Sequence, residues 1–219
     1  MDKNPEMKQQ FNFKASWKNA WQNRDFKFQS LISLSVLSVI AIFINDFFQY
    51  IEMREGFEIS DILLNNISPI NLSLYIFIML YAVIIASIFH LSHYPGILLK
   101  CLQAYVILTS MRILTILFFP LEPSASMIQL EDPFIGHLFY GNQIITKDLF
   151  FSGHISTMLL LVLYNPFRPF QYLFLTMTIL TAICILFQHV HYSIDILAAP
   201  LFSYLSYKAA NSIPLKINT

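Results

Sequence analysis

The sequence has few charged residues for its length. Only 12% of its 219 residues are charged, against about 25% in an ordinary soluble domain. Hydrophobic residues make up 56% and include 21 Phe and 11 Tyr. A soluble domain of this size has too little interior to bury so much apolar surface. The composition therefore predicts an integral membrane protein with several spans.

The sequence also has few cysteines and glycines, and its net charge is zero. The two cysteines, Cys101 and Cys184, lie in apolar runs, so neither a disulfide framework nor a thiolate metal site is indicated. Five Gly and ten Pro exclude a low-complexity chain. The 13 basic residues balance 13 acidic ones, which leaves no electrostatic signature of nucleic-acid binding. We expect no nucleic-acid partner, and the oligomeric state stays open.

Uncharged windows of about 20 residues mark the candidate spans. We predict an all-α integral membrane fold, a bundle of six transmembrane helices with a short interfacial segment at the N-terminus. The expected segments are a polar segment (1–27), spans at 28–50, 71–91, 97–119, 152–164, 170–188 and 191–210 within a membrane domain (28–210), and a tail (211–219).

Basic residues are unevenly placed along this arrangement. Ten lie on the side of the termini, whereas only Arg54 and Lys147 fall in the opposite loops. The positive-inside rule then places both termini in the cytoplasm and the 120–148 loop outside. Trp17 and Trp21, interleaved with basic residues, suit a helix on the cytoplasmic membrane face. A flexible polar tail is the alternative.

Three ionisable residues recur at the starts of the fourth and sixth spans, on one side of the membrane. His191 and Asp195 are one helical turn apart, so the carboxylate can accept the imidazole N–H and leave the other ring nitrogen as a nucleophile. His154 arrives on another helix and can donate a proton to a leaving oxygen. Ser152 and Gly153 offer a hydroxyl and backbone N–H groups to phosphate oxygens. The pattern indicates phosphoryl transfer.

These segments resemble the sphingomyelin synthase branch of the type-2 phosphatidic acid phosphatase superfamily. The resemblance covers about residues 105–200. Its three segments are Phe151-Ser152-Gly153-His154, His189-x-His191-Tyr192-x-Ile194-Asp195, and Arg112-Ile113-Leu114-Thr115 followed by Pro120-Leu121-Glu122-Pro123.

The resemblance implies a phosphohistidine mechanism at an extracytoplasmic site, with His191 as nucleophile, Asp195 as its orienting partner and His154 as acid and base. It implies transfer of a phosphate or phospho-head group from a phospholipid to a lipid acceptor such as ceramide or diacylglycerol. A lipid phosphatase with water as acceptor uses the same residues. We expect no metal or cofactor.

Two positions depart from the wider superfamily pattern. Phe151 replaces a Pro, and Ile185 replaces an Arg six residues before the nucleophile. Arg112 is the candidate to supply the missing cation, unless it extends to the membrane surface. Lys147, with Asp148 beside it, can steer a head group or be solvated.

Tyr192 can bind a lipid phosphate or serve as an interfacial anchor. His189, two positions before His191, is expected to face away from it. Two other readings stay open. One is a proton-coupled transporter, and the other is a zinc site built from His154, His191 and Asp195.

Overall fold

The computed structural model describes residues 13–132 and 145–215. Within these ranges the chain is all-helical, with seven α-helices, one 3-10 turn and no strand. The elements are α1 (Phe13–Gln22), α2 (Arg24–Glu52), η1 (Leu64–Asn66), α3 (Ser73–Leu91), α4 (Pro95–Phe118), α6 (Gly153–Tyr164), α7 (Arg168–Phe187) and α8 (Ser193–Ser212). Parts of the expected leader (1–12), outer loop (133–144) and tail (216–219) lie outside the described residues.

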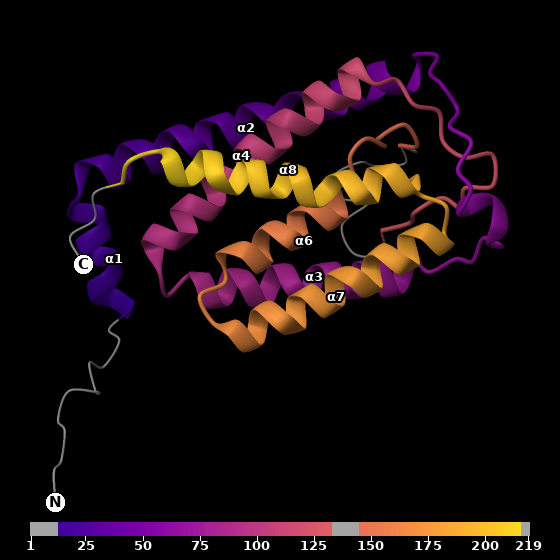
Figure 1. The fold of residues 1–219 in the computed structure, drawn as a ribbon. Coiled ribbons are helices and arrows are strands. Elements are labelled where there is room, and N and C mark those ends of the chain that lie inside the picture. Colours follow the sequence, from indigo (N-terminus) through magenta and orange to yellow (C-terminus); the bar gives the residue numbers. More distant parts are fainter. Residues whose placement is uncertain (1–12, 133–144, 216–219) are drawn as a thin grey trace, which may run out of the picture.

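The six longer helices lie side by side along one direction, so the bundle has two ends (Figure 1). α4 packs between α2 and α8, while α6 is in contact with α3, α4, α7 and α8. α1 and the last turn of α8 lie at one end, which we call the terminal end. The loops after α2 and α4 lie at the other, which we call the loop end.

Four helices are long and apolar enough to cross a membrane: α2, α3, α4 and α7. This confirms a multi-pass membrane protein, but not the count of six spans. α6 has 12 residues, about 18 Å of helix, whereas the hydrocarbon core is about 30 Å thick. α8 has 20 residues but is less apolar, because it contains Asp195, Lys208 and several serines.

Capping residues explain where the helices differ from their expected bounds. α2 begins at Arg24 because Asn23 caps it, and the Asn23 side chain accepts the N–H groups of Asp25 and Phe26 at 2.8 and 3.2 Å. α8 begins at Ser193, so His191 lies in the turn before the helix and not on it. The polar leader does contain a helix, α1, as expected.

Helices α6 and α8 pack closely against each other, and this packing positions the loop end. Small residues of α8, Ala199 and Ser203, are buried against α6. The Ser203 hydroxyl donates to the Ser156 carbonyl at 2.9 Å, a contact that fixes the two helices against each other. By contrast, the outer face of α2 is apolar and exposed, with Ile42 at 70%, as expected for a surface that meets lipid.

Candidate active site

The starts of α6 and α8 meet at the loop end. The Ser152 N–H, at the N-cap of α6, donates to the Asp195 carbonyl in α8 at 3.2 Å. Asp61, from the loop after α2, accepts the Ser193 N–H at 2.6 Å and the Ser193 hydroxyl at 3.0 Å. These contacts join three separate chain segments at the place where the sequence puts its candidate histidines.

His191 and Asp195 are in contact and almost fully buried. Nδ1 of His191 lies 3.4 Å from Oδ2 of Asp195, and their side chains are 2% and 0% exposed. The same Oδ2 accepts the Tyr192 N–H at 3.0 Å. The sequence predicts both residues on one helical stripe, which is wrong for His191. The turn before α8 supplies His191, and the carboxylate holds both that turn and the imidazole.

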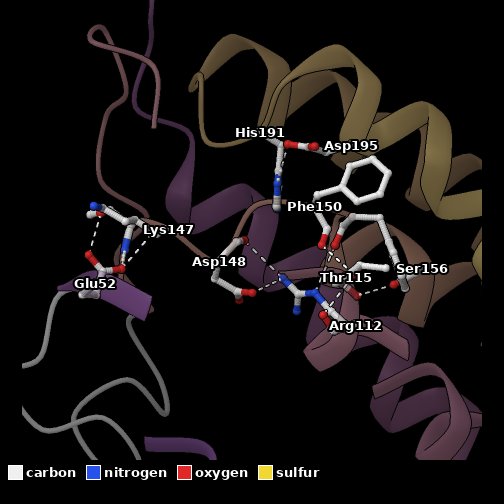
Figure 2. A network of polar contacts seen from close by, with 12 residues as sticks. Glu52, Arg112, Thr115, Lys147, Asp148, Phe150, Ser156, His191 and Asp195 are labelled. Atoms are coloured by element: carbon white, nitrogen blue, oxygen red, sulfur yellow. Dashed lines mark hydrogen bonds and ion pairs between the residues drawn. The ribbon is translucent and has the colours of Figure 1, made fainter. Parts of the chain in front are cut away.

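His154 faces His191 from the first turn of α6. The centroids of the two rings are 6.5 Å apart, and the rings meet edge to face. Phe77 of α3 packs 5.8 Å from the His154 ring on centroids. The structure thus brings the three predicted catalytic side chains together, as Figure 2 shows for His191 and Asp195.

Three buried polar atoms around this pair have no hydrogen-bond partner within the described residues. They are Nδ1 of His154, Oγ of Ser152 and Oδ1 of Asp195. Buried polar atoms are usually paired in native proteins, so a group of unpaired ones is a feature of sites that bind or react. The atoms comprise an imidazole nitrogen, a hydroxyl and a carboxylate oxygen, which suits a polar ligand.

Arg112 reaches from α4 to the start of α6. Its Nε donates to the Phe151 carbonyl at 3.0 Å, and its Nη2 contacts the Asp148 carboxylate at 2.6 Å. A Cβ added to Gly153 would lie 2.0 Å from Nη1 of Arg112. The guanidinium therefore lies directly against Gly153, and only glycine leaves room for it. Thr115, one turn later, donates to the Phe150 carbonyl at 2.9 Å.

The two departures from the superfamily pattern have a packing explanation. Phe151, in place of Pro, is fully buried and stacks on Phe202 of α8 with centroids 4.1 Å apart. Ile185, in place of Arg, is fully buried in an apolar cluster with Ile76 and Ile155. A cation at position 185 would face that cluster, so the arginine near the histidines comes from α4.

Lys147 and Tyr192 are tied into the loops. The Lys147 ammonium pairs with Glu122 at 2.7 Å and donates to the Arg54 carbonyl at 2.6 Å. Glu52 accepts the Lys147 N–H, and this pair lies apart from the Arg112 group in Figure 2. The Tyr192 hydroxyl donates to the Glu122 carbonyl at 2.9 Å. Both side chains hold the loop end together, and a role in binding substrate stays a prediction.

Sequence reasoning missed Gln188 and the use of His189. The Gln188 side chain is fully buried, accepts the Leu72 N–H at 2.9 Å and donates to the Ser73 hydroxyl at 2.7 Å. His189 has a positive φ of 58° and its Nδ1 lies 2.6 Å from the Ser126 hydroxyl. The position of Gln188 directly after an apolar stretch could have indicated a hydrogen-bonded junction, because a buried amide needs several partners.

In the described ranges, no group of three or more His, Cys, Asp and Glu side chains is placed to hold a metal ion.

The family described as PAP2 superfamily C-terminal matches residues 147–212, which include α6 to α8 and both histidine segments. The match supports the type-2 phosphatidic acid phosphatase superfamily for this part of the chain, and with it an activity on phosphoesters. No curated protein and no solved structure matches the chain.

Proposed function

We propose that this protein is a membrane lipid phosphotransferase that moves a phosphate or phospho-head group from a phospholipid to a lipid acceptor through a phosphohistidine. The observation that carries the proposal is the buried His191 and Asp195 pair with His154 across from it at 6.5 Å. Both rings can reach one phosphoryl group at this separation, and Arg112 lies beside the start of α6.

Each side chain has a role in the proposed reaction. Asp195 holds the Nδ1–H of His191, so Nε2 carries the lone pair that attacks phosphorus. The bond from phosphorus to the leaving oxygen breaks as His154 gives that oxygen a proton. In the second half, His154 takes the proton of the acceptor hydroxyl, whose oxygen attacks the phosphohistidine and releases His191.

The charges at the loop end favour a phosphodiester over a phosphomonoester as donor. Asp148 neutralises Arg112, and Glu122 neutralises Lys147. A phosphomonoester carries a charge of about −1.5 to −2 at pH 7, whereas a diester carries a single negative charge. Asp195 adds a further carboxylate, so the site has little cationic charge to hold a dianion. A head-group lipid therefore suits it better than phosphatidate.

The burial of His191 favours a lipid acceptor over water. Its side chain is 2% exposed, and a site closed to water protects a reactive intermediate from hydrolysis. The phosphatase alternative uses the same three residues and differs only in the acceptor, so product analysis separates the two.

The decisive experiment uses the full chain in lipid vesicles with labelled donors and acceptors. Phosphatidylcholine and phosphatidylethanolamine serve as phosphodiester donors, phosphatidate as the monoester, and ceramide and diacylglycerol as acceptors. We expect head-group transfer from a diester that survives EDTA. Release of inorganic phosphate from phosphatidate would support the phosphatase instead. Proton flux without any lipid product would support the transporter.

We further propose that the loop end is extracytoplasmic, because the terminal end carries most of the basic residues. Gln129 is exposed at the loop end and Asn19 is exposed at the terminal end. In a chain without its two native cysteines, Gln129→Cys should react with an impermeant thiol reagent in intact cells. Asn19→Cys should react only after lysis, and the reverse pattern would overturn the orientation.

A further inference from the structure

The hydrogen-bond donors of Arg112 fall into two sets. Nε and Nη2 are occupied: Nε donates to the Phe151 carbonyl at 3.0 Å, and Nη2 contacts both the carboxylate and the carbonyl of Asp148, at 2.6 and 3.3 Å. One edge of the guanidinium is therefore fully held by the segment that leads into α6.

Nη1 of Arg112 is different. It makes no hydrogen bond or ion pair with any of the described residues, and it lies against Gly153 at the first position of α6. The backbone N–H groups at a helix N-terminus attract anions. The unpaired Ser152 hydroxyl and His154 Nδ1 belong to the same first turn. A phosphate oxygen bound at the start of α6 would therefore contact Nη1, at the end of the guanidinium.

We propose that Asp148 is a positioning residue for Arg112: its carboxylate and carbonyl hold the guanidinium so that Nη1 is presented to a phosphate group at the start of α6. This inference rests on the proposed function for the identity of the ligand. The ion pair is partly buried, with side chains 19% and 25% exposed. Without the contacts from Asp148, the Phe151 carbonyl is the one hydrogen-bond partner that still fixes the long Arg112 side chain among the described residues.

The alternative is that Asp148 competes with phosphate for Arg112. A carboxylate and a phosphate offer similar oxygens to a guanidinium, so a competing Asp148 must leave before phosphate binds. The two ideas make opposite predictions for Asp148→Asn, which removes the charge and keeps the shape and the backbone carbonyl.

Dimethyl phosphate, a soluble phosphodiester with a single negative charge, is the probe for the first measurement, by calorimetry on the full chain in detergent with His191→Ala to prevent turnover. If Asp148 positions Arg112, Asp148→Asn should weaken the affinity for dimethyl phosphate about tenfold, the scale of one charge-assisted contact. Glu122→Gln is the matched control, because it removes the carboxylate of the neighbouring Lys147 ion pair. It should change the affinity less than about twofold. Tighter binding in Asp148→Asn would overturn positioning in favour of competition.

The second measurement does not depend on phosphate. The chain has only four arginines, Arg24, Arg54, Arg112 and Arg168, so the Nε–H signals of ¹⁵N-arginine protein can be assigned by substitution. Asp148→Asn should broaden or shift the Arg112 signal, and Glu122→Gln should not. An unchanged signal overturns the inference. If that signal moves but the His191→Ala protein binds no dimethyl phosphate, positioning stands and the proposed function loses its support.

Discussion

The two ends of the helical bundle differ in charge and in how their polar groups are used. Among the described residues, the loop end holds ten carboxylates and three cations, whereas the terminal end holds seven cations and one carboxylate, Asp25. The carboxylates of the loop end are Asp46, Glu52, Glu55, Glu58, Asp61, Glu122, Glu131, Asp132, Asp148 and Asp195.

At the terminal end, side-chain donors close helix ends. The Lys100 ammonium donates to the carbonyls of Ala210 and Ile213 at 2.9 and 2.5 Å, which satisfies the C-terminus of α8. The Trp17 indole donates to the Ser92 carbonyl at 2.7 Å, just after α3. These contacts stabilise the bundle.

At the loop end, Arg112 and Lys147 pair with carboxylates and His191 contacts Asp195, whereas Nδ1 of His154 has no partner among the described residues. Buried atoms without partners occur at both ends, including Nε2 of His90 near the terminal end. Around His154 and His191, the unpartnered atoms comprise an imidazole nitrogen, a carboxylate oxygen and a hydroxyl. The polar contacts of the terminal end thus close helix ends, whereas the loop end leaves polar atoms available for the proposed reaction.

The largest expected effect comes from His191→Ala. Removing the proposed nucleophile should lower turnover by about 10⁴-fold or more and abolish any acid-labile phosphoryl label on the protein. The matched control is His93→Ala, which removes an imidazole at the terminal end and should leave turnover within about twofold. Substantial activity in a folded His191→Ala protein would contradict the assignment of the nucleophile.

Gly153→Ala should have the next largest effect. A Cβ at this position would lie 2.0 Å from Arg112 Nη1, so the guanidinium must move, although alanine is the better helix former. We expect turnover to fall about 100-fold with little loss of thermal stability, measured by lipid assay and melting.

A double-mutant cycle tests the cause of that loss. If the damage passes through Arg112, adding Gly153→Ala to Arg112→Ala should cost little more than Arg112→Ala alone. Fully additive losses would show that Gly153 acts by another route. Arg112→Lys should be nearly as harmful as Arg112→Ala, because an ammonium cannot reproduce the contacts of Nε, Nη1 and Nη2 together.

The sequence predicts the helical membrane fold and the grouping of His154, His191 and Asp195, because apolar windows and motif spacing are local signals. It does not reveal that His191 lies in a turn, since the i, i+4 spacing to Asp195 is the same in a helix. The sequence proposes Arg112 as the cation that binds phosphate, which stays a prediction, and it gives no sign of the pairing of Arg112 with Asp148. That contact joins residues 36 apart, and no sequence periodicity encodes it.

The count of spans shows the same limit. Residues 152–164 and 191–210 are predicted as spans from their low charge, yet α6 is shorter and α8 more polar than the four helices that are long and apolar enough to cross a membrane, α2, α3, α4 and α7. Met158 of α6 and Ala199 of α8 are buried against neighbouring helices. These two helices are therefore stabilised by packing within the bundle and not by a long apolar surface that faces lipid.

Lys100→Met tests the terminal end. It removes the donor to two carbonyls at the end of α8, a loss of about 1 kcal/mol. For a chain of this size that corresponds to a melting temperature lower by about 2–4 °C. The kcat should not change, because the proposed site lies at the other end. A parallel fall of kcat would show that the two ends are coupled.

The smallest effect concerns Asp61, which joins η1 and the start of α8 at the loop end. Burial raises the pKa of Asp61, but hydrogen bonds from Ser193, Leu64 and Leu63 outweigh it, so the pKa lies below the usual value of 3.8. A carboxyl with a lowered pKa stabilises the folded state above its unfolded pKa, and the contribution is lost as pH falls through the folded pKa. Asp61→Asn should therefore lower the melting temperature slightly at pH 7. The difference from the unaltered protein should shrink between about pH 4 and pH 2, and an equal difference at pH 7 and pH 2 would show that the carboxylate charge does not stabilise this junction.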